Sequence, residues 1–189
     1  MQSRQSEIAH EVIESVVHLT EQRDELTLLR SLQASILEML PGVQASMVCL
    51  VPGPQRGQWI HDTACSLPKP MFPVTDSLVA EAAGLSADAP ARQLEHEGQR
   101  YLISSLGLLE DRRKAIVLRQ AEWGAVDLRI AQGMLKIYAN YAKMLFDSER
   151  DTLTGLYNRK KLEQKLGDLL AARLRGGHRQ RDDGTTDYL

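Results

Sequence analysis

Few residues of this sequence have both the type and the spacing that metal chemistry needs. His61 and Cys65 would share one face of a strand predicted over residues 59–66, because alternate side chains of a strand point the same way. A metal or haem ligand pair is conceivable there, but no other histidine or cysteine is close in sequence, so we predict packing and assign no metal ligand. Cys49 lies in an earlier predicted strand, and we expect both cysteines to remain thiols in a cytoplasmic protein.

Basic residues near the C-terminus are the other candidate for binding chemistry. Five of them between residues 173 and 181 could hold a phosphate, but glycines at 176, 177 and 184 favour a flexible polar loop. The formal net charge of the 189-residue chain is −2, which disfavours nucleic-acid binding. No apolar run approaches the ~20 residues that cross a bilayer, so we expect no membrane span.

The decapeptide from Asp151 to Lys160 stands between two helical patterns. Asp151 and Thr154 are residue types that cap helix N-termini, and Gly155 permits a backbone conformation that other residues avoid. The pattern predicts a hinge between two helices.

This decapeptide resembles the opening of the GGDEF domain of diguanylate cyclases, which reads D-x-L-T-G-L-x-N-R-R. Lys160 replaces the last arginine, and the matching residues are Asp151, Leu153, Thr154, Gly155, Leu156, Asn158 and Arg159. The resemblance implies that residues 151–189 are the start of such a domain, with its first helix and loop only. The alternative is a helical corner that shares these letters by chance.

The groups that carry the family's chemistry would all follow Leu189. The D-x-D-x-F-K metal strand and the GG(D/E)EF turn are absent from the printed sequence, so we assign no catalytic residue and no cofactor to this fragment and expect it to be a truncated, inactive piece. In a full-length enzyme the resemblance implies Mg²⁺ bound with GTP and the joining of two GTP molecules into cyclic di-GMP.

Apolar periodicity and turn residues predict an α+β fold. A helix covers residues 1–20 and another follows to residue 40, with a break near Thr20 and an end marked by Pro41 and Gly42. Strands lie near 45–51, 59–66, 92–96, 100–106 and 115–118, with a short helix near 75–83. The apolar run from Met47 to Val51 suits a strand covered on both faces. The order of elements resembles a GAF domain over residues 21–147, with an antiparallel sheet of five to six strands flanked by helices and a long C-terminal signalling helix. The resemblance places any ligand pocket beside the loop from Pro68 to Pro73, lined by Trp59, His61, Tyr101 and Ile103. A domain without a ligand is the alternative.

The closing helix, predicted over residues 127–150, has a wide apolar arc. One seam contains Leu128, Ala131, Leu135, Tyr138, Ala142 and Leu145, and a second contains Ile130, Met134, Ile137, Tyr141 and Met144. At about 100° per residue the two seams cover roughly 200°, about twice what packing on one sheet requires. We therefore expect a second neighbour, either the same helix of a second chain or the N-terminal helix, and a homodimer through the N-terminal and stalk helices. A core helix enclosed within one chain is the alternative.

These patterns favour the sensory and dimerisation region of a cytoplasmic diguanylate cyclase, with an unknown small ligand or protein bound to the GAF-like part. The alternative is a non-enzymatic GAF-like interaction module of a degenerate GGDEF scaffold or cyclic di-GMP receptor.

Overall fold

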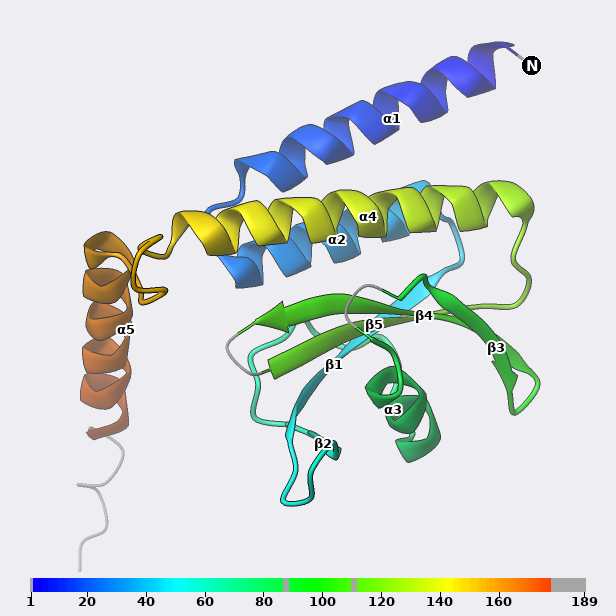
Figure 1. Cartoon of the computed structure of the whole chain (residues 1–189). Helices are drawn as coiled ribbons and strands as arrows, with labels where there is room; N and C mark the ends of the chain where they lie inside the picture. Colours follow the sequence, from blue (N-terminus) through cyan, green and yellow to red (C-terminus); the bar gives the residue numbers. More distant parts are fainter. Residues whose placement is uncertain (1, 87–88, 110–111, 178–189) are drawn as a thin grey trace, which may run out of the picture. The chain divides into compact units, whose positions relative to one another are not determined.

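The computed structural model describes residues 2–86, 89–109 and 112–177. These residues form two compact units, which divide after Leu145. The first unit is an α+β fold around one antiparallel sheet of five strands, as predicted (Figure 1). The strands are β1 (Gln44–Pro52), β2 (Trp59–His61), β3 (Arg92–His96), β4 (Gln99–Leu109) and β5 (Arg112–Gln120), in the order β2-β1-β5-β4-β3.

Helices cover both faces of this sheet. α2 (Glu25–Met39) and α4 (Ala125–Ser148) lie on one face and α3 (Asp76–Ala83) on the other (Figure 1). α1 (Gln2–Glu21) packs against α2. The break predicted near Thr20 falls at residues 22–24, because the Asp24 carboxylate caps α2 by accepting the Thr27 N–H at 3.0 Å.

Two hydrophobic cores lie on opposite faces of the sheet. In β5, Ile116 and Leu118 belong to the core under α2 and α4, whereas Ala115 and Val117 belong to the core under α3. β1 is buried continuously from Ala45 to Leu50, which confirms the prediction that this strand is covered on both faces.

The second strand is shorter than predicted. β2 ends at His61, because the Asp62 carboxylate accepts the backbone N–H of Ala64 at 3.0 Å and turns the chain. Cys65 therefore lies in a loop, and the prediction that it shares a strand face with His61 is wrong.

The second unit contains the end of α4, a turn over residues 151–158 and α5 (Arg159–Gly177). α4 ends at Ser148 instead of residue 150. The loop predicted for the basic cluster is wrong where the structure describes it, because Arg173 and Arg175 lie in α5, which continues to Gly177. The rest of the cluster falls outside the described residues, which end at 177.

Candidate functional site

Asp151 organises the turn that begins the decapeptide. Its Oδ1 accepts the N–H groups of Leu153 at 3.2 Å and Thr154 at 2.9 Å, and the Thr154 hydroxyl also donates to it at 2.9 Å. The backbone hydrogen bond from Thr154, followed by that from its hydroxyl, lowers the pKa of Asp151. Gly155 has φ +70°, a left-handed conformation that explains why glycine stands here.

The helix that follows is capped by another residue of the decapeptide. α5 begins at Arg159, and the Asn158 side chain accepts the Lys161 N–H at 3.0 Å. The prediction that Asp151 or Thr154 caps this helix is therefore wrong, since both belong to the preceding turn.

Asn158 also joins the two sides of the corner. Its Nδ2 donates to the Ser148 carbonyl at 2.7 Å, and its backbone N–H donates to the Glu149 carbonyl at 2.8 Å. The Arg150 guanidinium lies over the rings of Phe146, at 4.2 Å, and Tyr157, at 4.9 Å. The end of α4 and the start of α5 are thus tied by several interactions, whereas the sequence predicted only a hinge.

Large apolar side chains of the second unit are exposed. Leu153 is 94% and Leu156 68% exposed. Along α5 the exposed leucines recur at helical spacing, at Leu162, Leu166, Leu169 and Leu170. This spacing forms one apolar stripe, as on a helix that packs against a larger domain.

The first seam of α4 faces its own chain. Ala131, Leu135, Tyr138 and Ala142 are buried, and Leu128 and Leu145 are half-buried against the same core. In the second seam Met134 is buried, Met144 is exposed, and Ile130, Ile137 and Tyr141 are half-buried.

The C-terminal end of α1 is a neighbour of the second seam. The Tyr141 hydroxyl donates to the Thr20 carbonyl at 2.5 Å and to the Gln22 carbonyl at 3.0 Å. One of the two neighbours predicted for α4, the N-terminal helix, is thus found within the chain. The width of the apolar arc alone therefore no longer argues for a second chain.

A buried polar group lies in the first seam. Tyr138 is fully buried, and its hydroxyl has no hydrogen-bond partner in the part of the chain that the structure describes. Burial, and to a smaller extent the Glu25 carboxylate, raises the pKa of Tyr138. Glu25 in turn forms an ion pair with Lys114, at 2.5 Å between Oε2 and Nζ.

The four residues predicted to line a ligand pocket have different surroundings. Tyr101 and Ile103 are buried in the core under α3, and the Tyr101 ring lies 6.2 Å from that of Phe72. Trp59 is half-buried beneath the Arg113 guanidinium, 4.1 Å from the ring centre, and His61 is exposed. Side chains thus fill much of the face on which a ligand was predicted.

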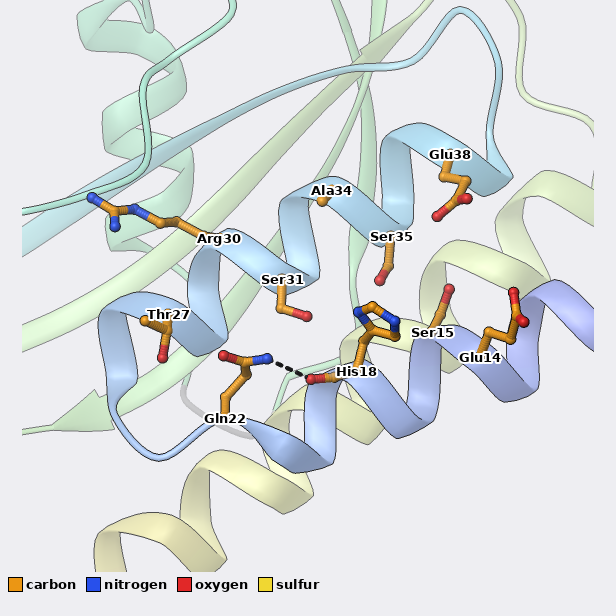
Figure 2. Close-up of a pocket in the computed structure, with 10 residues that line it drawn as sticks. All are labelled: Glu14, Ser15, His18, Gln22, Thr27, Arg30, Ser31, Ala34, Ser35 and Glu38. Carbon is orange, nitrogen blue, oxygen red and sulfur yellow. Dashed lines mark hydrogen bonds between the residues drawn. The ribbon is translucent and has the colours of Figure 1, made fainter.

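A groove of about 490 Å³ runs between α1 and α2 (Figure 2). Most of the residues that line it are of polar type, among them His18, Arg30 and the buried Ser15 and Ser35. The Gln22 amide donates to the His18 carbonyl at 2.7 Å, at one end of the groove. Helical spacing gave no sign of this groove.

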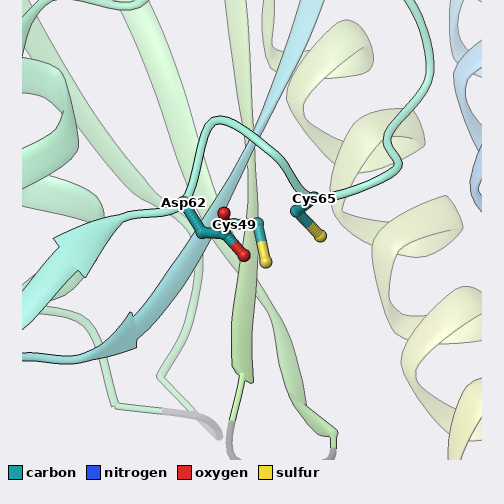
Figure 3. A group of neighbouring side chains, drawn as sticks. All are labelled: Cys49, Asp62 and Cys65. Atoms are coloured by element: carbon teal, nitrogen blue, oxygen red, sulfur yellow. The ribbon is translucent and has the colours of Figure 1, made fainter. Parts of the chain in front are cut away.

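A third group of residues was missed because one member, Cys49, is distant in sequence from the other two, Asp62 and Cys65. The Sγ atoms of Cys49 and Cys65 and a carboxylate oxygen of Asp62 all lie within 4.8 Å of one another (Figure 3). Burial, with a smaller contribution from Cys65, raises the pKa of the Cys49 thiol to about 12. The D-x-x-C spacing from Asp62 to Cys65 was the only local signal, and the incorrect strand prediction placed these two side chains on opposite faces.

No protein-family model, curated protein or solved structure matches this chain. Among the described residues, no helix is long and apolar enough to cross a membrane.

Proposed function

We propose that this chain is the sensory and dimerisation region of a diguanylate cyclase. The decapeptide from Asp151 to Lys160 carries the proposal, because it shares the opening of the GGDEF domain. In support, its polar residues have definite structural roles: Asp151 holds a turn, Gly155 takes a left-handed conformation and Asn158 caps α5. These roles give the shared residue types a physical reason.

The leucine stripe of α5 supports the same proposal. A 19-residue helix with Leu162, Leu166 and Leu169 exposed lacks the apolar contacts that stabilise most protein helices. We propose that the stripe packs inside a catalytic domain that continues past Leu189.

The arrangement of the first unit supports a GAF-like sensor. A five-stranded antiparallel sheet has α2 and α4 on one face and α3 on the other, and a sheet flanked by helices is what the resemblance implies. The bound molecule would be a small ligand or a protein. Such a molecule regulates the enzyme only if it binds two conformations with different affinity.

Exposed apolar residues of α1 support a place for the contact between two chains in the proposed homodimer. Ile13 is 62% and Val17 47% exposed, and residues four apart lie on the same helix face. In the proposed homodimer this face of α1 packs against its copy. Dimer geometry matters because the two bound GTP molecules must meet in line, and small misplacements of reacting groups slow such reactions strongly.

The enzymatic proposal is tested with protein that includes the residues after Leu189. Incubation with GTP and Mg²⁺ is expected to yield cyclic di-GMP, detected by mass spectrometry. A protein that forms none with any effector refutes the cyclase proposal; cyclic di-GMP binding by that protein would favour the alternative receptor or scaffold.

The dimer is tested separately by light scattering of the 189-residue chain. The Ile13→Glu and Val17→Glu variants are expected to weaken dimerisation by at least about tenfold, or ~1.4 kcal/mol. His18→Glu, which changes an exposed polar residue of the same helix, is the matched control. A monomeric wild type, or variants that dimerise as tightly as wild type, would refute this interface.

A further inference from the structure

The group formed by Cys49, Asp62 and Cys65 joins β1 to the loop that follows β2. Cys49 is fully buried in β1, Asp62 follows β2, and Cys65 is half-buried in the loop beyond it. The Asp62 N–H donates to the Cys49 carbonyl at 2.8 Å, which fixes the start of the loop against β1. Figure 3 shows the three side chains near one another.

We propose that these three residues form a binding site for a zinc-class divalent cation. Two thiolates and one carboxylate are a ligand set that suits Zn²⁺ better than Mg²⁺ or Ca²⁺, which prefer oxygen alone. Zn–S bonds of about 2.3 Å and tetrahedral angles place two sulfurs roughly 3.8 Å apart. The three ligand atoms already lie within 4.8 Å of one another, so closure around the ion requires movements of about 1 Å.

The neighbouring side chains are arranged as outer partners of such an ion. Asp62 Oδ1 accepts the Ala64 N–H, and Oδ2 lies 3.7 Å from an Arg112 nitrogen. The hydrogen bond from Ala64 and the ion pair with Arg112 are outer contacts of the kind that orient a ligating carboxylate. Lys114 does not add an unpaired positive charge, since its ammonium is paired with Glu25.

The charges balance when the ion is bound. Binding of the ion releases the two thiol protons to water. The resulting thiolates and the carboxylate carry a charge of −3, and a divalent cation reduces it to −1. The guanidinium of Arg112, close to both Asp62 and Cys65, offsets the remaining charge. A half-buried site of this kind needs such compensation because isolated charges are costly away from water.

A cavity beside Cys65 leaves room for a fourth ligand. It measures about 250 Å³ and is lined in part by Cys65, Ser66, Arg112 and Lys114. Three protein ligands and one open position are typical of zinc sites that bind water or an exchangeable anion. We therefore expect the fourth ligand to be water, or an anion attracted by Arg112.

The test is a Co²⁺ and Zn²⁺ titration of the whole chain, reduced with a phosphine and kept free of oxygen. Wild type is expected to bind one Co²⁺ per chain with a thiolate-to-cobalt charge-transfer band and intense tetrahedral d–d bands, and Zn²⁺ should displace the cobalt. Zn²⁺ should also raise the Tm.

Variants distinguish this site from incidental binding. Cys65→Ser, a change in a loop, is expected to weaken metal binding by more than about 100-fold, and Asp62→Asn by about 10–100-fold. Loss of a residue that only orients a metal ligand already lowers metal affinity by about 10–100-fold, so loss of a ligand should cost at least as much. His61→Ala removes an exposed residue next to Asp62 and should leave affinity, spectrum and Tm shift unchanged. Cys49→Ser gives a further check, and circular dichroism establishes that each variant is folded.

Several results would overturn the proposal. They are the absence of the charge-transfer band in reduced wild type, equal affinity in the Cys65→Ser variant, or loss of binding in the His61→Ala variant. Because no cyclase assay is involved, the outcome is independent of the proposed function.

Discussion

The buried hydroxyl of Tyr138 leads to a prediction whose sign is unusual. A buried polar group without a hydrogen bond loses its interactions with water and gains nothing in return, at a cost of about 1–3 kcal/mol. Tyr138→Phe removes that oxygen and leaves the ring in the core between the sheet and the helices. We therefore expect the substitution to raise the free energy of unfolding by about 1–3 kcal/mol, and the Tm by roughly 2–4 °C per kcal/mol.

Tyr141 provides a matched control on the same helix. Its hydroxyl donates to the carbonyls of Thr20 and Gln22, so Tyr141→Phe is expected to lower the free energy of unfolding by about 0.5–1.5 kcal/mol. The same chemical change, three residues apart, should therefore have opposite effects.

Urea denaturation followed by tryptophan fluorescence measures both variants. The two tryptophans of the chain, Trp59 and Trp123, both lie in the first unit, so the signal reports the unit that contains both tyrosines. If Tyr138→Phe lowers stability as much as Tyr141→Phe, the Tyr138 hydroxyl has a partner, such as an ordered water, and the reasoning is refuted.

Two further predictions concern the corner between α4 and α5. Gly155→Ala should destabilise the corner by about 1–2 kcal/mol because φ is +70°. Gly167→Ala, inside α5 with open space around it, should instead stabilise the helix by up to about 1 kcal/mol. Helicity and amide exchange measure both, and two changes in stability of the same sign would contradict the left-handed conformation at Gly155. Because Thr154 lowers the folded-state pKa of Asp151, the carboxylate stabilises the corner at neutral pH, and this stabilisation is lost as the pH falls from the ordinary carboxyl range through the lowered pKa. Thr154→Ala removes the hydroxyl donor and keeps the backbone N–H, so NMR titration of the carboxyl should show its pKa rising part of the way to the ordinary value; an unchanged pKa would contradict the contribution of the hydroxyl.

Local patterns in the sequence were sufficient to predict much of the fold. The run from Met47 to Val51 predicted a strand buried on both faces, and β1 is buried in this way as far as Leu50. Pro41 and Gly42 predicted the end of a helix, and α2 ends at Met39 with Gly42 at φ +88°. Such features depend on neighbouring residues, so a single sequence contains the information.

Features that depend on distant residues were not predicted correctly. The apolar periodicity of α4 predicted the width of its apolar arc but not the segment that covers it. The N-terminal helix and a second chain therefore remained alternatives, and the structure shows Tyr141 in contact with the end of α1. The strand predicted to reach Cys65 hid the turn at Asp62, where side-chain hydrogen bonding overrides alternation. The approach of Cys49 to these two residues follows from strand pairing between β1 and β2.

The borders of the sheet limit how copies of this chain can associate. β2, at one border, is only three residues long, and β3, at the other, has the exposed charged residues Arg92 and Glu95. Short or charged border strands discourage a sheet from extending into a neighbouring molecule. Association of two chains by extension of the β-sheet is therefore disfavoured at both borders. If subunits associate, we expect them to do so through helical surfaces.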